Sequence, residues 1–317
     1  MQAFVIRRIA ALVPTLFFAS VIVFMVVRLI PGDVIDLMLS QDGGADKLDR
    51  GALERALGFD RPMVEQYLRW IGGVLFEGDF GLSLWRQTPV ADMLAARLPV
   101  TLELSLLALA IALAIALPIG ILSAIRQDTA ADYIARSFSI FMLAVPGFWI
   151  ATIIVVFPAI WWGWSPEVNF TPFREDPLAN LKQLIIPALI MGTSLSAVTI
   201  RMMRTTMLEV LRQEYVRTAW AKGLSERVVV VRHVLKNALI PVVTVIGLQA
   251  TLLIGGSVIM EQIFVIPGMG LLLIEAVFDR DYPIVTGVFL VTGVAIVLIN
   301  FLVDLSYGLL DPKVRLE

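Results

Sequence analysis

The feature that most constrains the fold is a series of long apolar runs, which recur along the whole 317-residue chain. A helical run of about 20 residues matches a hydrocarbon core about 30 Å thick. Transmembrane strands are shorter and alternate in hydropathy, so helices are favoured over a barrel. Only 16% of the residues are charged, whereas about a quarter are charged in soluble proteins. We therefore predict an all-α integral membrane protein.

The apolar runs predict six transmembrane helices in one domain. The expected spans are residues 9–30, 98–125, 137–161, 184–200, 240–260 and 284–310. The first run is longer than the core of a signal peptide and no A-x-A-like cleavage site follows it, so a span is favoured over a removed leader. Pro146 and Pro158 interrupt the third run, which indicates that it faces protein or a cavity. In the fifth run, Gly247, Gly255 and Gly256 predict close helix contact.

Positively charged residues predict how the chain is oriented. With six spans, both termini, the turn at 126–136 and the loop at 201–236 share one side. That side carries Arg7, Arg8, Arg126, Arg136, Lys313 and Arg315, together with eight further Lys and Arg residues within 201–236. The other side, apart from its long first loop, carries Arg174, Lys182 and Arg280. Both termini and the 201–236 loop are therefore predicted to be cytoplasmic.

The long loop on the other side, residues 33–97, has an amphipathic pattern of its own. Residues 46–57 have helical spacing that Gly58 stops. Asp60 is then expected to cap a second helix, with Pro62 in its first turn. We predict an external amphipathic segment that lies on the membrane surface.

The cytoplasmic loop 201–236 has the pattern of two helices joined by a glycine turn. Gly223 suits the left-handed position after a helix, and Ser225 suits the cap of the next helix. The second helix is expected to carry Val228, Val231 and Leu235 on one face and to lead into the fifth span at Pro241. Small residues beside cationic tips would suit docking of another protein. An ordinary basic cytoplasmic loop explains the charges equally well.

No motif for catalysis or nucleotide binding is present in the sequence. None of the five lysines lies in a G-x-x-x-x-G-K-[ST] loop, the single histidine, His233, has no H-E-x-x-H context, and there is no cysteine. We predict no catalytic residue, no metal site and no cofactor bound by this chain. If transport consumes ATP, the ATPase is a separate chain.

The polar loop also resembles a known family. YVRTAWAKGLSER at 215–227 and RHVLKNALIP at 232–241 are similar to the Glu-Ala-Ala loop of binding-protein-dependent ABC importer permeases. RLPVTLE at 97–103, EQIFVIPGMG at 261–270 and RDYP at 280–283 extend the resemblance over nearly the whole chain. Arg217-Thr218-Ala219 stands where the broader family has Glu-Ala-Ala, a departure similar to the oligopeptide, dipeptide and nickel subclass. The long first loop and RDYP resemble the first of that subclass's two paired permeases.

The resemblance implies a six-helix type I ABC importer permease in the bacterial inner membrane. Such a permease forms half of a pathway for peptides, beside a homologous second permease in the lipid bilayer. One or two cytoplasmic ABC ATPases would hold ATP and Mg, a periplasmic or lipid-anchored protein would deliver the substrate, and no nucleic acid is involved. Import of nickel or another small solute is the alternative. A stand-alone channel or secondary transporter is the alternative of another class, although inverted repeats and midplane ionisable groups are not evident.

The resemblance also implies two functional regions. The ATPase-docking residues would be Glu214, Tyr215, Arg217, Thr218, Ala219, Ala221, Lys222, Gly223, Leu224, Ser225 and Arg227. An outer gate or binding-protein contact would include Pro267, Gly268, Met269, Gly270, Arg280, Asp281 and Tyr282. The 267–270 segment could be a re-entrant plug or a plain turn.

Polar groups inside or near the spans have two interpretations each. Glu103 and Asp304 lie near span ends, where structural pairing is favoured over a transport role. Thr199 and Gln249 could line a polar path or join two helices by hydrogen bonds.

Overall fold

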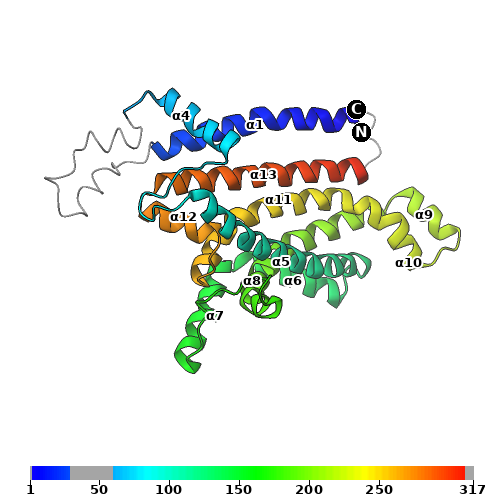
Figure 1. Cartoon of the computed structure of the whole chain (residues 1–317). Coiled ribbons are helices and arrows are strands. Elements are labelled where there is room, and N and C mark those ends of the chain that lie inside the picture. The colour runs from blue at the N-terminus through cyan, green and yellow to red at the C-terminus, as the bar shows by residue number, and fades with distance from the viewer. Residues whose placement is uncertain (1, 29–59, 311–317) are drawn as a thin grey trace.

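The structure of the chain is a computed structural model that describes residues 2–28 and 60–310. The predicted helical pattern at 46–57 lies outside the described residues. The described part is nearly all helical, as predicted (Figure 1). Its elements, in which η denotes a π-helix, are α1 (Gln2–Arg28), α4 (Met63–Gly72), η1 (Gly73–Glu77), α5 (Val90–Ile125), α6 (Ala130–Ala144), α7 (Gly147–Trp162), α8 (Pro177–Leu211), α9 (Glu214–Ala221), α10 (Glu226–Val228), η2 (Val229–Val234), α11 (Leu235–Ile263), α12 (Met269–Phe278) and α13 (Tyr282–Leu310).

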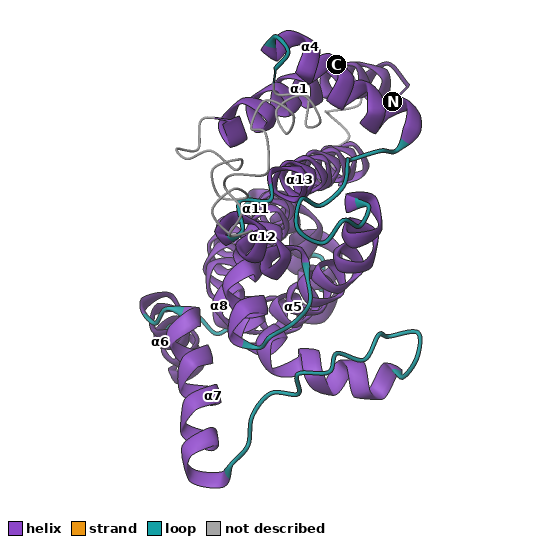
Figure 2. Cartoon of the chain, turned by 60° about the vertical axis from the view of Figure 1, so that its left-hand side comes forward, coloured by secondary structure: helices purple, strands orange, loops and turns teal. Residues whose placement is uncertain are grey.

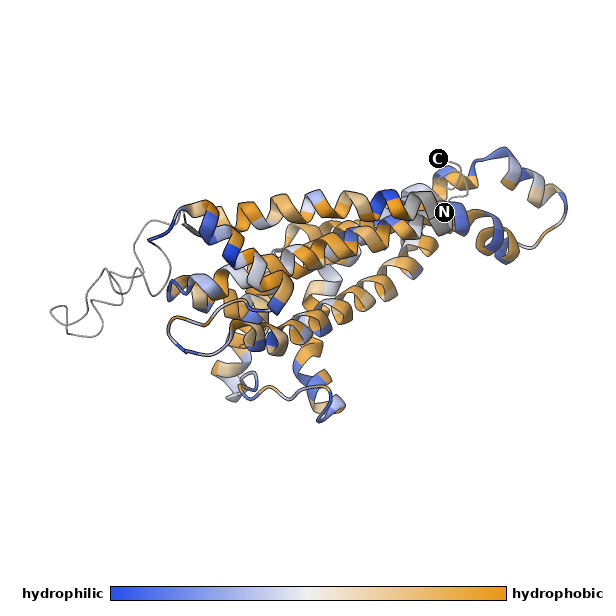
Figure 3. Ribbon diagram, turned by 45° about the horizontal axis from the view of Figure 1, so that its top comes forward, coloured by the Kyte–Doolittle hydropathy of each residue, from blue (hydrophilic) through white to orange (hydrophobic). Residues whose placement is uncertain are grey.

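Helices long and apolar enough to cross a membrane form the body of the molecule. Within the described ranges these are α1, α5, α8, α11 and α13, and the pair α6 and α7 makes a sixth span if it is counted as one. Most residues along the bundle are hydrophobic, and hydrophilic residues gather towards its two ends (Figure 3). This arrangement matches a hydrocarbon core between two aqueous faces.

The single third span expected at 137–161 is instead two helices, which meet at an angle of 81°. Val145 is extended, with φ −96° and ψ 119°, and Pro146 follows it. The ring of a proline excludes the helical conformation from the residue before it and removes a backbone donor. The proline therefore breaks the span, and α7 projects from one side of the bundle (Figure 2).

Two other helices run beyond their expected bounds. The helix expected at 98–125 begins at Val90, so the end of the predicted external segment is helical. The helix expected at 184–200 runs from Pro177 to Leu211. The side chain of Asp176 accepts hydrogen bonds from the backbone N–H groups of Leu178 and Ala179, and Pro177 occupies the first turn, so this start has both features of a stable N-terminus.

The centre of the fold is a close contact between α5 and α8. Small residues recur at every fourth position of α5 and are buried: Ala108, Ala112, Ala116, Gly120 and Ala124. A Cβ added to Gly120 would lie 2.7 Å from Cβ of Met203, and one added to Gly192 would lie 2.7 Å from the carbonyl oxygen of Ala108. Small residues let helix backbones approach closely, which stabilises helix pairs in lipid through van der Waals contact.

The glycines of α11 behave differently from one another. A Cβ at Gly247 would collide with the side chain of Val303 on α13, as close helix contact requires. A Cβ at Gly255 or Gly256 would meet nothing within 4 Å, so the prediction of close contact is wrong for these two within this chain. The helical repeat explains the difference: Gly247 lies on the face of α11 that meets α13, and Gly255 and Gly256 lie on other faces.

Polar pairs also join the spans. Thr199 on α8 donates a hydrogen bond to Gln249 on α11 at 2.9 Å, and Gln249 donates to the carbonyl of Leu195 at 2.8 Å. These two residues therefore join helices to each other. Arg8 and Asp304 form an ion pair at 3.0 Å, which places the start of α1 beside the end of α13.

The amphipathic helix predicted in the long first loop starts later than expected. α4 begins at Met63 and its N-cap position is Pro62, without a side-chain cap, whereas Asp60 was the predicted cap. The helix continues through η1 until Gly78, whose φ is +67°. A hydrogen bond between Ser20 and Tyr67 at 2.8 Å attaches α4 to α1.

A buried ion pair holds α6 against α8. The carboxylate of Asp132 is fully buried and accepts two hydrogen bonds from Arg204, at 2.7 and 2.8 Å. It also accepts from the hydroxyl of Ser123 at 2.6 Å and from the backbone N–H of Asp128 at 3.0 Å. Three spans therefore meet at one carboxylate.

We expect Asp132→Asn to destabilise the protein by about 3 kcal/mol, because it leaves Arg204 without its partner in a mostly buried site. The measurement is the apparent melting temperature in detergent. The control, Glu65→Gln, removes an exposed carboxylate that pairs with Arg61 and should cost less than about 1 kcal/mol. Equal shifts for the two variants would contradict the role given to Asp132.

Candidate functional site

The loop that follows α8 lies at one end of the bundle. α9 and α10 are found at the end where α1 starts and α13 finishes, whereas α4, α7 and α12 lie towards the other end (Figure 1). α8 ends at Leu211, and α9 starts at Glu214 after a short turn. The loop therefore extends the α8 and α11 spans beyond the apolar body.

The turn at Gly223 closes α9 through a double hydrogen bond. The N–H of Gly223 donates to the carbonyl of Trp220 at 2.9 Å, and the N–H of Leu224 donates to that of Ala219 at 3.4 Å. Gly223 has φ +79°, and this pattern is the Schellman motif, in which glycine is preferred. A Cβ at Gly223 would meet nothing within 4 Å, so backbone conformation alone requires the glycine.

The tip of the loop is exposed from residue 220 to residue 228. It presents the cationic Lys222 and Arg227, the anionic Glu226 and the apolar Leu224, which is 39% exposed. Beside it on α9, Arg217 and Glu214 form an exposed ion pair at 2.9 Å. Thr218 donates to the backbone of Glu214, and Tyr215 accepts from Asn237 at 2.7 Å.

The inner side of α9 packs into the bundle. Val216 and Ala219 are buried, with 0% and 5% exposure, in a cluster that includes Met203 and Met207 of α8. The same cluster contains Val229, Val230 and Val234 of η2 and Ala238 and Val242 of α11. Ala219 was predicted to face a partner, but its methyl group faces this cluster instead. The exposed tip is therefore attached to two spans through a continuous apolar core.

The second half of the loop differs from its predicted pattern. The structure leaves Val228 and Val231 exposed at 40% and 57% and buries Val229, Val230 and Val234 instead. Residues 229–234 form a π-helix, in which a turn takes more residues than in an α-helix, so the expected α-helical face is wrong. Ser225 is at the N-cap position, but its side chain makes no cap hydrogen bond.

The predicted outer cluster divides into two buried anchors. In the first, the fully buried carboxylate of Glu261 accepts from the backbone N–H groups of Gly270 and Leu271 at 2.7 and 3.0 Å, and from the hydroxyl of Thr101 at 2.7 Å. The Thr101 hydroxyl accepts in turn from the N–H of Met269 at 2.8 Å. A carboxylate at a helix N-terminus is favourable. The 267–270 segment is therefore the start of α12.

In the second anchor, Asp281 joins the turn between α12 and α13 to the loop before α5. It accepts from the hydroxyl of Ser83 at 2.6 Å and from the N–H of Leu84 at 3.0 Å. Trp85 donates to the carbonyl of Asp279 at 2.6 Å, and Arg86 pairs with Glu275 at 2.8 Å. These contacts connect residues about 200 positions apart.

The predicted outer residues are not all accessible. Gly268, Met269, Gly270 and Asp281 are buried, whereas Pro267, Arg280 and Tyr282 are partly exposed. The anchoring roles of Glu261 and Thr101 were not predicted from the sequence, although both residues lie within EQIFVIPGMG and RLPVTLE. The sequence feature that could have indicated the role of Glu261 is its position: it is a charged residue at the end of an apolar span, nine residues before Gly270 at the start of α12.

Glu103 and Asp304 both have partners in the structure. Glu103 accepts a hydrogen bond from the buried Asn180 at 3.2 Å, and Asp304 pairs with Arg8. Each of the two carboxylates therefore has a partner within the chain.

Comparison with known proteins identifies the class as a membrane permease of transport systems that use a binding protein. Residues 116–316 match the family described as binding-protein-dependent transport system inner membrane component. Residues 1–105 match the N-terminal family of the same membrane components. The chain belongs to this family.

Curated relatives refine the assignment. The chain is 36% identical to the dipeptide transport system permease protein DppB of Escherichia coli, over 99% of each chain. It is 38% identical to the oligopeptide transport system permease protein AppB of Bacillus subtilis, over 99% of this chain and 100% of that one. The protein is a permease subunit of a binding-protein-dependent importer in the bacterial inner membrane, and these curated relatives are named as peptide permeases.

Solved structures support the fold. The MetNI methionine ABC transporter in an inward-facing conformation has a chain that matches with a TM-score of 0.54 at 16% identity, over 69% of this chain and 96% of that one. A chain of an amino acid ABC transporter matches with a TM-score of 0.52 at 14% identity, over 68% and 92%. The predicted importer permease fold is confirmed.

We expect Gly270→Ala to destabilise the protein by about 1 to 3 kcal/mol, the usual cost of overpacking. The added Cβ would lie 2.5 Å from the Cα of Val258, and α11 and α12 cannot both keep their positions. Gly256→Ala, the control in α11, adds a Cβ that meets nothing within 4 Å. The apparent melting temperature should fall only for Gly270→Ala, and an unchanged value would contradict the tight packing at the start of α12.

Proposed function

We propose that the exposed tip at residues 220–228 docks on a separate cytoplasmic ATPase and transmits its motion to the membrane spans. The main support is that residues 220–228 are exposed, whereas the inner side of α9 beside them packs in an apolar cluster with residues of α8 and α11. A docking element needs an accessible surface, and a transmitting element needs a packed connection. The loop has both.

The packing of the loop supports a rigid-body response. Val216 and Ala219 contact the same apolar cluster as residues of α8, η2 and α11, so a displacement of α9 moves these elements together. Asp132 then links α8 to α6 and to the end of α5 through Arg204 and Ser123. A movement at the tip would therefore reach four spans, as alternating access by rocking requires.

The ATPase partner would supply the nucleotide chemistry. ATP and Mg bind to one or two ABC ATPase subunits, and this chain holds neither. Ala221, Lys222, Gly223, Leu224, Ser225 and Arg227 lie on the exposed tip and would contact the ATPase, with Glu214, Tyr215, Arg217 and Thr218 at its margin. Ala219 would act by packing beneath the tip.

The orientation follows from the same assignment. Both termini and the tip would face the cytoplasm, in agreement with the distribution of Lys and Arg. A homologous second permease would complete the pathway, with this chain as the first of the pair. A periplasmic or lipid-anchored binding protein would deliver peptides to the opposite end, where Pro267, Arg280 and Tyr282 are partly exposed.

We expect Gly223→Trp to reduce recovery of the ATPase with the permease by about tenfold, because strain at a positive φ and bulk at the tip both oppose docking. The measurement is co-purification of the ATPase with this chain and its partner permease. Gly163→Trp is the matched control, since Gly163 also has a positive φ of 65° and open space around it, but follows α7 outside the tip. Equal recovery from both variants would contradict docking at the tip.

Cross-linking gives an independent test. The chain has no cysteine, so single cysteines at Lys222 and Ser225 would be the only thiols in this subunit. Both should form adducts with the ATPase in an active complex, whereas a cysteine at Gly163 should not. Absence of adducts from both tip positions would count against the proposal.

A further inference from the structure

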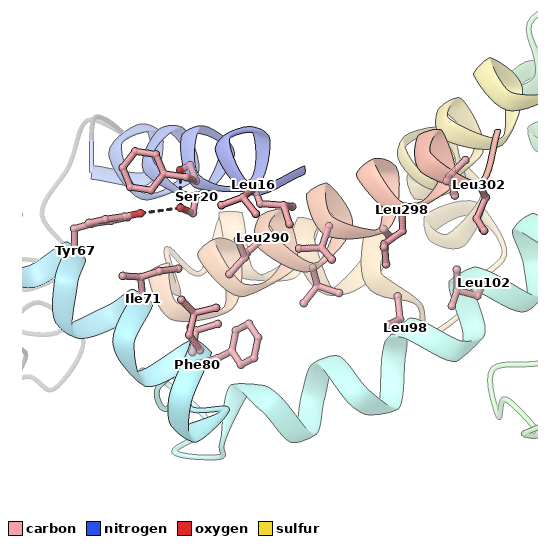
Figure 4. Close-up of a pocket in the computed structure, with 18 residues that line it drawn as sticks. Leu16, Ser20, Tyr67, Ile71, Phe80, Leu98, Leu102, Leu290, Leu298 and Leu302 are labelled. Carbon is pink, nitrogen blue, oxygen red and sulfur yellow. Dashed lines mark hydrogen bonds between the residues drawn. The ribbon is translucent and has the colours of Figure 1, made fainter. Parts of the chain in front are cut away.

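The outer part of α5 separates two cavities of different chemistry. On one side, Leu98 and Leu102 line an apolar groove of about 780 Å³ between α1, α4, α5 and α13 (Figure 4). Its hydroxyl groups, from Ser20 and Tyr67, bond to each other. On the other side, a cavity of about 660 Å³ is lined by Arg97, Glu103 and Arg174 together with apolar residues.

The charged groups of the second cavity are not paired with one another. Among the described residues, Arg97 and Arg174 have no ion-pair partner, and Glu103 makes only its hydrogen bond with Asn180. Opposite charges thus line one cavity without neutralising each other. A ligand with one positive and one negative group could pair with the carboxylate and the guanidinium groups at once. In the apolar groove the same ligand would lose its hydration without gaining a charged partner.

The wall of this cavity that carries Glu103 is held in place. Asn180 is buried and donates both to Glu103 at 3.2 Å and to the carbonyl of Thr171 at 3.0 Å, so it fixes the carboxylate relative to the 170–174 loop. Gln183 accepts from the N–H of Thr171 at 3.0 Å and donates to the carbonyl of Asn169 at 2.9 Å. A preorganised site loses less conformational freedom when a ligand binds.

The dimensions of the cavity suit a short peptide. Arg97 and Glu103 are six residues apart on α5, which is about 9 Å along the helix axis. The two termini of an extended dipeptide are about 7 Å apart, at about 3.3 to 3.6 Å per residue. Flexible Arg and Glu side chains can bridge the difference. Phe170 and Phe173 add apolar walls for peptide side chains, and a volume of this size is typical of small-molecule sites.

We propose that this cavity is a binding site for the zwitterionic backbone of a short peptide, with Glu103 holding the ammonium group and Arg97 and Arg174 holding the carboxylate. The inference rests on the peptide importer function and adds a permease site for the termini, which all unmodified peptides share. Pro267 also lines the cavity, so the site adjoins the turn that leads into α12. A site for termini accepts varied sequences and rejects blocked peptides.

The test uses the assembled transporter in lipid nanodiscs, trapped with ATP and vanadate, with radiolabelled dialanine as the probe. Wild type should retain the label after the binding protein is removed. Glu103→Gln and the double variant Arg97→Gln/Arg174→Gln should each retain at least about tenfold less, because each loses charge-assisted hydrogen bonds. Glu103→Asp and the corresponding double Lys variant should retain more than the neutral variants. Acetylated, amidated dialanine should not be retained by wild type.

Control variants make the same chemical changes outside the cavity. Glu77→Gln and Arg69→Gln alter exposed residues of η1 and α4 and should retain as much label as wild type. Stoichiometric co-purification of all subunits shows that each variant has folded. Retention of dialanine by the neutral cavity variants at the wild-type level would overturn the site, as would retention of the blocked dipeptide or no retention by wild type. ATPase recovery and peptide uptake by wild type test the proposed function separately.

Discussion

The close contact between α5 and α8 is the interaction on which the rest of the structure depends. In lipid the hydrophobic effect does not bring helices together, so the contact relies on small residues and van der Waals packing. The alanine and glycine stripe of α5 lies against α8, where the missing side chain of Gly192 and the side chain of Met203 complete the fit. This contact places Thr101 and Ser123 of α5 where their hydroxyl groups donate hydrogen bonds to carboxylates of other helices.

Three buried carboxylates secure the ends of this core. Asp132, Glu261 and Asp281 each accept from one Ser or Thr hydroxyl and from at least one backbone N–H. Their partners come from separate parts of the chain, so each carboxylate joins segments that apolar packing alone would leave free to slide. Asp132 also accepts hydrogen bonds from Arg204, in the part of the bundle from which the loop with α9 and α10 extends. Buried charges persist where such hydrogen bonds offset desolvation.

The two ends of the bundle have complementary roles. One end carries the loop whose apolar underside is shared by α8, η2 and α11. The other end carries α12, the anchored turns and the charged cavity beside α5. Because the same long helices run between them, a rotation of α8 or α11 at one end changes the surroundings of the other. Through this continuity, docking at the proposed tip would reach the opposite end of the bundle.

The sequence by itself determined the membrane class and the glycine turn, because composition, run length and a left-handed glycine are local properties. The Gly223 turn was predicted correctly for that reason. Tertiary structure alone decided which faces are buried: it turned Ala219 inward, exposed Val228 and Val231 through a π-helix, and divided the third span by 81° at Pro146. It also brought Glu261 to Thr101 and Asp281 to Ser83, contacts between residues up to 198 positions apart. Local pattern does not say which distant residue becomes the partner, since such pairings depend on how whole helices pack.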